Sequence, residues 1–166
     1  MIEYNKSLEY IVGDTLDLKL IKYFEGNNIE IPYYWYEIIL KSINKSIGKI
    51  SIRIGNNYHS YYNGNIGYEI DEEYRGKNYS YIASKMVLDI AKIYGMSFVY
   101  LTCNNDNIAS YKIIEKLGSN LIESVVAPKN YFGYYYGIPL QRIYKLNLWI
   151  PIYYSDFMNN FKLLWK

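Results

Sequence analysis

The strongest constraint on the fold is a change of hydrophobic period within one short segment of the chain. From Ile66 to Ile70 apolar residues alternate with other residues, which is the pattern of a half-buried strand. From Ser80 to Tyr94 they recur at helical spacing, and Gly95 follows as a stop signal. The apolar run Phe98 to Thr102 then indicates a buried strand. Two strands joined by one helix are expected to run parallel, so this segment predicts a β-α-β unit.

The rest of the chain adds one more helix and several strands to this unit. A second helix is predicted after a cap at Asp106 or Asn107, because four residues share one face before Gly118: Ser110, Ile113, Ile114 and Leu117. Alternating patterns predict further strands at Leu16–Leu20, Tyr33–Leu40, Ile50–Ile54, Leu121–Val126 and Gln141–Leu148. An amphipathic helix is predicted near the C-terminus, from Ser155, and we expect it to serve packing. No linker or repeat divides residues 1–166, which predicts a single α/β domain.

Composition excludes several classes of function. A net charge of +2, from 18 basic and 16 acidic side chains, is too small for a typical nucleic-acid-binding surface. Cys103 and His59 are the only residues of their types, which excludes an internal disulfide and the common histidine-rich metal sites. No signal peptide or membrane span of about 20 apolar residues is visible, so we expect a cytoplasmic, metal-free protein. Phosphate-loop, dinucleotide, serine-hydrolase and zinc-protease motifs do not occur.

One loop has the chemistry of an anion site. It joins the strand ending at Ile70 to the helix beginning at Ser80, and it contains Arg75, Gly76, Lys77 and Asn78. The N-terminus of a helix offers free N–H groups and the positive end of the helix dipole. Gly76 permits unusual backbone angles, Asn78 tolerates a positive φ, and the two basic side chains add charge. The residues alone leave a phosphate-binding turn and an ordinary solvated loop as alternatives.

The order of residues in two segments carries a resemblance to a known family. The run Arg75-Gly76-Lys77-Asn78-Tyr79-Ser80 resembles the pyrophosphate-binding motif Arg/Gln-x-x-Gly-x-Gly/Ala of the GNAT superfamily of N-acetyltransferases. The segment Asn107 to Gly118, with Ser110, Glu115 and Lys116, resembles the second signature of that superfamily, Asn-x-x-Ser-x-x-x-x-Glu-Lys-x-Gly. The resemblance covers roughly residues 47–126 and is greatest to a group of bacterial predicted acetyltransferases. Asn78 and Ser80 depart from it, because glycine or alanine is usual at those positions.

The resemblance implies a fold and a cofactor. The fold is an α/β (α+β) GNAT-like mixed sheet, mostly antiparallel, of about six to seven strands, with helices on both faces. The parallel fourth and fifth strands splay apart, and acetyl-CoA binds in the V between them as co-substrate. By carry-over, the backbone of Ile70 and Asp71 pairs with pantetheine, and Asn107 and Ser110 contact the cofactor. The resemblance assigns pyrophosphate binding to the turn that begins at Arg75 and continues through Gly76, Lys77, Asn78, Tyr79 and Ser80.

Catalysis requires a base for the amine and a proton for the leaving thiolate. Many GNAT enzymes supply that proton from a tyrosine in the second motif, but the matching position here is Ile114. Tyr111 is a candidate acid, with Ser110 or water as alternatives. Glu69 is the candidate base, because it lies opposite the apolar face of its strand. Cys103 is interpreted as a structural thiol, so direct transfer is expected.

The predicted function is therefore transfer of an acetyl group to a primary amine of an unidentified acceptor, which is either a small molecule or a peptide. No nucleic acid, membrane or metal is expected, and the protein is expected to be a monomer or a homodimer. The alternative is a catalytically degenerate sensor that binds a CoA thioester, motivated by Ile114 and the altered glycine positions. An aromatic loop around Tyr131 to Tyr136 is a candidate cover for the acceptor site.

Overall fold

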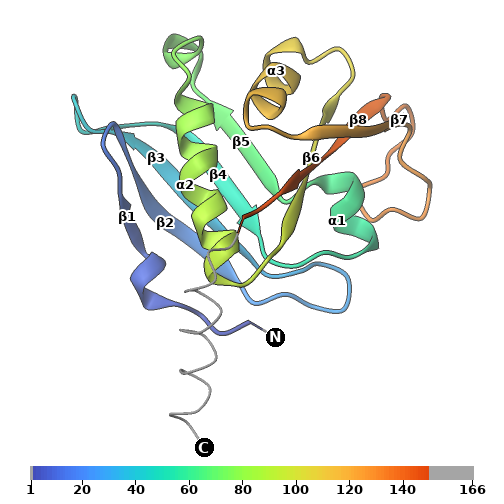
Figure 1. Cartoon of the computed structure of the whole chain (residues 1–166), viewed down its shortest axis with the longest axis horizontal. Coiled ribbons are helices and arrows are strands. Elements are labelled where there is room, and N and C mark those ends of the chain that lie inside the picture. Colours follow the sequence, from blue (N-terminus) through green and yellow to red (C-terminus); the bar gives the residue numbers. More distant parts are fainter. Residues whose placement is uncertain (1, 150–166) are drawn as a thin grey trace, which may run out of the picture.

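The computed structural model describes residues 2–149, which form two antiparallel sheets and three α-helices (Figure 1). The first sheet has the strand order β1-β2-β3-β4-β5 and the second has the order β6-β8-β7. The strands are β1 (Tyr10–Val12), β2 (Leu16–Phe24), β3 (Tyr33–Leu40), β4 (Lys45–Arg53), β5 (Ile66–Ile70), β6 (Phe98–Asn104), β7 (Asn120–Val125) and β8 (Gln141–Asn147). The helices are α1 (Tyr58–Asn63), α2 (Tyr79–Ile93) and α3 (Ile108–Lys116), with 3₁₀ turns η1 (Lys6–Leu8) and η2 (Glu72–Tyr74).

Helix α2 covers one face of the first sheet and forms the core with it (Figure 1). Its apolar side includes Ala83, Val87 and Ile90, all buried, as the helical spacing requires. On β4, Ile50 and Ile52 are completely buried against this side. Alternate residues of the same strands point away from α2, and they form a second, more exposed face of the sheet.

The buried residue Asn65, which directly precedes β5, links the two sheets by hydrogen bonds. Its backbone N–H donates to the carbonyl of Tyr100 on β6 at 2.7 Å, and its side-chain Oδ1 accepts from the N–H of Tyr100 at 2.7 Å. Its Nδ2 donates to the carbonyls of Arg53 and Gly55 at 3.1 and 2.8 Å. Beyond this junction β5 and β6 diverge toward their C-terminal ends (Figure 1). Helix α3 lies beside the open end of this V.

The fold predicted from the sequence is confirmed: the protein is a mixed α+β structure with antiparallel sheets and the two predicted helices. The divergence of β5 and β6 separates the strands into two sheets, and the short β1 raises their number within residues 2–149 to eight. Helix α1 was not predicted, and it contains His59. The predicted C-terminal helix lies outside the described residues.

Candidate functional site

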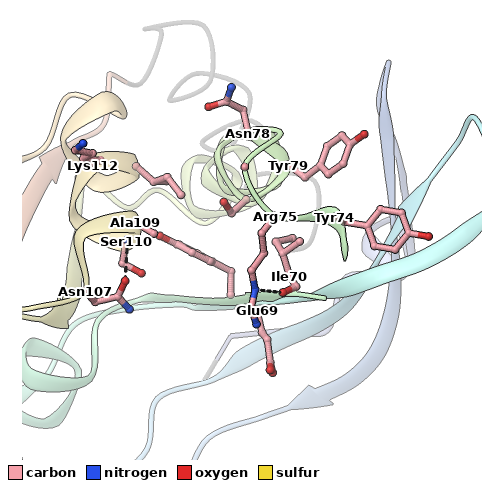
Figure 2. Close-up of a pocket in the computed structure, with 14 residues that line it drawn as sticks. Glu69, Ile70, Tyr74, Arg75, Asn78, Tyr79, Asn107, Ala109, Ser110 and Lys112 are labelled. Carbon is pink, nitrogen blue, oxygen red and sulfur yellow. Dashed lines mark hydrogen bonds between the residues drawn. The ribbon is translucent and has the colours of Figure 1, made fainter. Parts of the chain in front are cut away.

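A cavity of about 530 Å³ lies between β5, the N-terminal end of α2 and α3 (Figure 2). It brings together the two sequence segments that resemble cofactor-binding motifs, although a helix and a strand separate them in the chain. Most of the predicted site residues line it: Glu69, Ile70, Arg75, Gly76, Asn78, Tyr79, Ser80, Asn107 and Ser110. Of the remaining predicted residues, Asp71, Lys77 and Tyr111 do not line it.

The turn before α2 presents a row of free backbone donors. Gly76 and Asn78 both have positive φ values, of 78° and 61°, which turns the chain sharply into the helix. The N–H groups of residues 76–81 make no hydrogen bond to another described residue. The first turn of a helix has no partners of its own for these groups, and the helix dipole makes this end positive. The turn is therefore equipped to hold an anionic group such as a phosphate.

Arg75 folds back over this turn and contacts the strand that precedes it. Its Nε donates to the carbonyl oxygen of Ile70 at 2.9 Å, as drawn in Figure 2. The N–H groups of the two terminal nitrogens of the guanidinium remain as further donors. Lys77 lies on the outer side of the turn, with its ammonium 5.7 Å from the centre of the Tyr74 ring. Of these two cations, Arg75 is the one that faces the cavity.

The edge of β5 that faces the cavity carries free backbone groups. The N–H of Asp71 points toward β4, where it donates to the carbonyl of Ile47 at 2.9 Å. Because backbone groups alternate in direction along a strand, the N–H and C=O groups of Tyr68 and Ile70 point the other way, into the V. The carbonyl of Ile70 accepts from Arg75, so this edge is open to pairing with an extended ligand at both backbone groups of Tyr68 and at the N–H of Ile70, and the N–H of Asp71 is engaged elsewhere.

Helix α3 closes the other side of the cavity. Asn107 is its N-cap, and the Asn107 side chain accepts from the N–H of Ser110 at 3.0 Å. Near the other end of α3, Lys116 donates to Oδ1 of Asn78 at 3.0 Å, which ties this helix to the turn before α2. Lys112 also lines the cavity and adds positive charge there, although its sequence position gave no signal.

Tyr68 is the residue that sequence reasoning missed most clearly. The alternation from Ile66 to Ile70 puts it on the apolar face of β5, where it packs against the core and also lines the cavity. Its hydroxyl oxygen is shielded from solvent and has no hydrogen-bond partner among the described residues. Burial raises the pKa of Tyr68, and the nearby Ser110 hydroxyl offsets this only in part. The Tyr68 hydroxyl is therefore available to contact a ligand in the cavity.

Glu69 lies at the boundary between this cavity and a second one of about 290 Å³. In Figure 2 its side chain points to the opposite side of β5 from Ser110. The second cavity lies on the sheet face that points away from α2, and Tyr68 lines both cavities. The two cavities therefore share Tyr68 and Glu69 in their linings.

Three other candidates lie outside the main cavity. The ring of Tyr111 packs under Arg142, whose guanidinium carbon lies 4.3 Å from the ring centre. Cys103 is buried, and burial raises its pKa to about 11, so it is an unreactive thiol at neutral pH. Tyr131 packs against Ala127 and Ile138 in a small second core and lines neither the main cavity nor the second one.

No cluster of three metal-ligating side chains occurs among residues 2–149. In the same part of the chain, no helix has the length and apolar character needed to cross a membrane. The position that usually carries the GNAT tyrosine holds Ile114, whose side chain is 2% exposed and belongs to the hydrophobic core. Ile114 therefore serves packing.

The splayed strands, the donor-rich turn and the capped helix α3 together define the class of an acyl-CoA-dependent transferase fold. The family model described as "Acetyltransferase (GNAT) domain" matches residues 11–120. The chain therefore belongs to the GNAT acetyltransferase family. A comparison with curated proteins found no match.

Solved structures support the same fold. A Vibrio cholerae protein described as a ribosomal-protein-serine acetyltransferase superposes with a TM-score of 0.60 at 17% identity, covering 84% of this chain and 97% of its own. The microcin C7 self-immunity acetyltransferase MccE, solved with acetyl-CoA and AMP, gives a TM-score of 0.54 at 21% identity, covering 70% and 61%. The ribosomal L7/L12 acetyltransferase RimL, solved with CoA, gives 0.54 at 19% identity, covering 70% and 62%. None of these comparisons supports the reading of the chain as a degenerate sensor.

Proposed function

We propose that this protein transfers the acetyl group of acetyl-CoA directly to a primary amine. The observation that supports this most strongly is the cavity itself, in which free donors at residues 76–81 lie at one end of an open strand edge. Tyr68 and Glu69 lie further back along the same strand edge, on β5, and also line the cavity. A CoA thioester has the matching order of groups, with a diphosphate, an extended pantetheine and a reactive carbonyl.

In this proposal each part of the cavity has one task. The N–H groups of residues 76–80, with Arg75, bind the diphosphate, because a helix N-terminus favours an anion. The backbone groups of Tyr68 and the N–H of Ile70 pair with the amides of pantetheine. Asn107 and Ser110 line the cofactor site on the side of α3. Asn78 keeps its side chain away from the diphosphate because Lys116 holds it on the α3 side.

The chemical step needs two proton transfers. The amine nitrogen attacks the thioester carbonyl carbon, a C–N bond forms, and the C–S bond breaks with its electron pair going to sulfur. Glu69 takes the proton that the amine loses, directly or through a water molecule. Tyr68 gives its hydroxyl proton to the thiolate, because its raised pKa keeps it protonated at neutral pH. Tyr111 remains the alternative candidate for the general acid.

A ligand-induced shift in melting temperature tests the cofactor part of the proposal. Acetyl-CoA at about 100 times its Kd should stabilise the protein by about 2.7 kcal/mol. For a chain of this size that raises Tm by roughly 5–10 °C. S-acetylpantetheine, which lacks the diphosphate, is the matched control and should give a much smaller rise. No shift with acetyl-CoA at millimolar concentration would exclude the proposal. Release of free thiol in the presence of amines then measures transfer.

A further inference from the structure

The second cavity, on the far side of β5, has a lining that is specific enough to indicate what it binds. Two aromatic rings, Tyr33 and Trp35, lie along it, with the carboxylates of Glu30 and Glu69 and the cations of Lys49 and Arg53. At about 290 Å³ it is small for a protein ligand site. A site that holds both signs of charge beside aromatic rings suits a small ligand that carries both charges and an apolar stem.

Arg53 is held in place at one end of this cavity with one side left open. With its amide oriented to satisfy both of its neighbours, Asn63 accepts from Nε and Nη2 of Arg53 at 3.1 and 3.2 Å. The described part of the chain places no carboxylate within 4.0 Å of this guanidinium. Burial lowers the pKa of Arg53, yet an arginine stays charged at any physiological pH. The more distant carboxylate of Glu30 acts on its charge without forming a salt bridge, so this half-buried guanidinium is a candidate receptor for an anion.

Gly67 provides the space next to that open side. It lies in the middle of β5, and its φ is not in the positive range, so the backbone does not need glycine there. A Cβ added to Gly67 would lie 3.9 Å from Nη1 of Arg53 and 3.3 Å from Oγ of Ser51. Glycine inside a strand weakens the strand and often marks close approach of a ligand. The missing side chain therefore leaves Nη1 of Arg53 accessible to an occupant.

The sheet register sets the direction of that occupant. Lys49 pairs with Glu69 across β4 and β5, and Ser51 pairs with Gly67, so Arg53 lies further along the same face. Four residues of antiparallel strand separate the Cα atoms of Lys49 and Arg53 by about 13 Å. Glu69 also lines the cofactor cavity, whereas Arg53 does not. The reacting end of an occupant therefore lies at Glu69 and its far end at Arg53.

We propose that the second cavity is the acceptor site and that its substrate is a small molecule with a primary amine at one end and a carboxylate or phosphate at the other. The inference rests on the proposed acetyltransferase function. The amine lies against Glu69 next to the thioester, the acid group binds Arg53, and the stem packs on Trp35 and Tyr33. Lys49, whose ammonium lies 5.8 Å from the Trp35 ring centre, adds positive charge to the part of the cavity between Glu69 and Arg53.

The test compares amines of one chain length that differ only in the far group. The probes are 6-aminohexanoate, 6-aminohexyl phosphate and 6-amino-1-hexanol, whose far group is neutral, with a tetrapeptide amide without charged side chains as a peptide acceptor. Thiol release from acetyl-CoA should give a kcat/KM at least about tenfold higher for one or both of the acid-bearing amines than for the alcohol. The two acid-bearing probes separate carboxylate from phosphate recognition. Equal or better use of the alcohol or the peptide, or no use of either acid-bearing amine, overturns the proposal.

Two variants tie the preference to the cavity. Arg53→Gln should remove most of the preference for the acid-bearing amine, and Arg53→Lys should restore part of it. Gly67→Ala should raise the acceptor KM with little change in the KM of acetyl-CoA. Lys6→Gln, a charge removal at an exposed position of η1 outside the cavity, is the matched control and should change neither value. An unchanged preference in Arg53→Gln contradicts the acceptor assignment. If the acceptor assignment fails in this way while acetyl-CoA still raises Tm in every variant, the cofactor proposal is unaffected.

Discussion

Asn65 makes two hydrogen bonds of 2.7 Å to the backbone of Tyr100, one from its own N–H to the carbonyl and one from the Tyr100 N–H to its side-chain Oδ1. These bonds hold β5 and β6 together at the point where the two strands begin to diverge. The side chain of Asn65 is completely buried and also donates to two carbonyl groups on and beyond β4. One polar side chain thus fixes the apex of the V in which the cofactor is proposed to bind. The junction sets the width of that V together with apolar side chains of both sheets, such as Ile66 and Leu101, that belong to the same core.

Replacing Asn65 should therefore destabilise the protein far more than replacing an exposed asparagine. Asn65→Ala leaves the N–H of Tyr100 and two carbonyl groups without partners, at a cost of about 2–4 kcal/mol in the free energy of unfolding. Asn104→Ala, at the exposed end of β6, is the control and should cost less than about 0.5 kcal/mol. Urea denaturation measures both values. A loss below about 1 kcal/mol for Asn65→Ala would show that the junction is held by other contacts.

Arg75 should contribute to acetyl-CoA binding through its charge at the donor-rich turn. Arg75→Glu removes the contact with Ile70 and places a negative charge beside the proposed diphosphate, so the Kd of acetyl-CoA should rise at least about tenfold. Lys85→Glu makes the same change of charge at an exposed position of α2 away from the cavity. Isothermal titration calorimetry should give an almost unchanged Kd for this control. Equal values for the two variants would refute the phosphate role of Arg75.

The choice between Tyr68 and Tyr111 as proton donor can be made with two phenylalanine variants. Tyr68→Phe should lower kcat about 100-fold while the KM of acetyl-CoA stays within about twofold, because only the leaving thiolate loses its proton source. Tyr111→Phe keeps the ring that packs under Arg142 and should retain kcat within about twofold. Steady-state kinetics with free-thiol detection separates the two. The reverse result would restore Tyr111 as the acid.

The pH dependence of the reaction follows from the raised pKa of Tyr68. Burial stabilises the neutral hydroxyl, so the proton is lost only above the ordinary tyrosine value of about 10. The donor form is therefore complete at neutral pH and persists as the pH rises to about 10. A profile of kcat should show no loss of activity from this group between about pH 7 and 9. A decline of kcat with an apparent pKa near 8, absent in Tyr68→Phe, contradicts this assignment.

Direct transfer predicts that Cys103 has no covalent role. Its pKa is raised to about 11 by burial, so the reactive thiolate is scarce at neutral pH. Cys103→Ala should keep kcat within about threefold, with a stability loss from the small cavity that it leaves. Intact-protein mass spectrometry after mixing with acetyl-CoA alone should show no added acetyl group. A stable acetyl adduct that disappears in the alanine variant would establish a covalent intermediate instead.

Hydrophobic period was sufficient to locate most of the framework that positions the site. The helix predicted from Ser80 to Tyr94 is α2, the helix capped at Asn107 is α3, and the strand from Ile66 to Ile70 is β5. These elements each bury one continuous face, and their patterns are long enough to be read locally. The strand β1 has three residues and α1 has six, which is too short for any period to be visible.

The site itself was only partly readable. The turn from Arg75 to Ser80 could be recognised because its chemistry is local, a glycine and two cations before a helix. Tyr68 could not, because a tyrosine on the apolar face of a strand is normally a core residue, and its unpaired hydroxyl is visible only in three dimensions. Asn65 and Arg53 were missed for the same reason, since their partners lie in other strands and helices.

The measurement that tests the central claim most directly is a crystal structure of the protein with bound CoA. The account places the diphosphate within hydrogen-bonding distance of the N–H groups of residues 76–80, pantetheine along Tyr68 and Ile70, and the sulfur next to the Tyr68 hydroxyl. A CoA molecule with its diphosphate away from the start of α2, or with its sulfur remote from Tyr68 and Glu69, would contradict it.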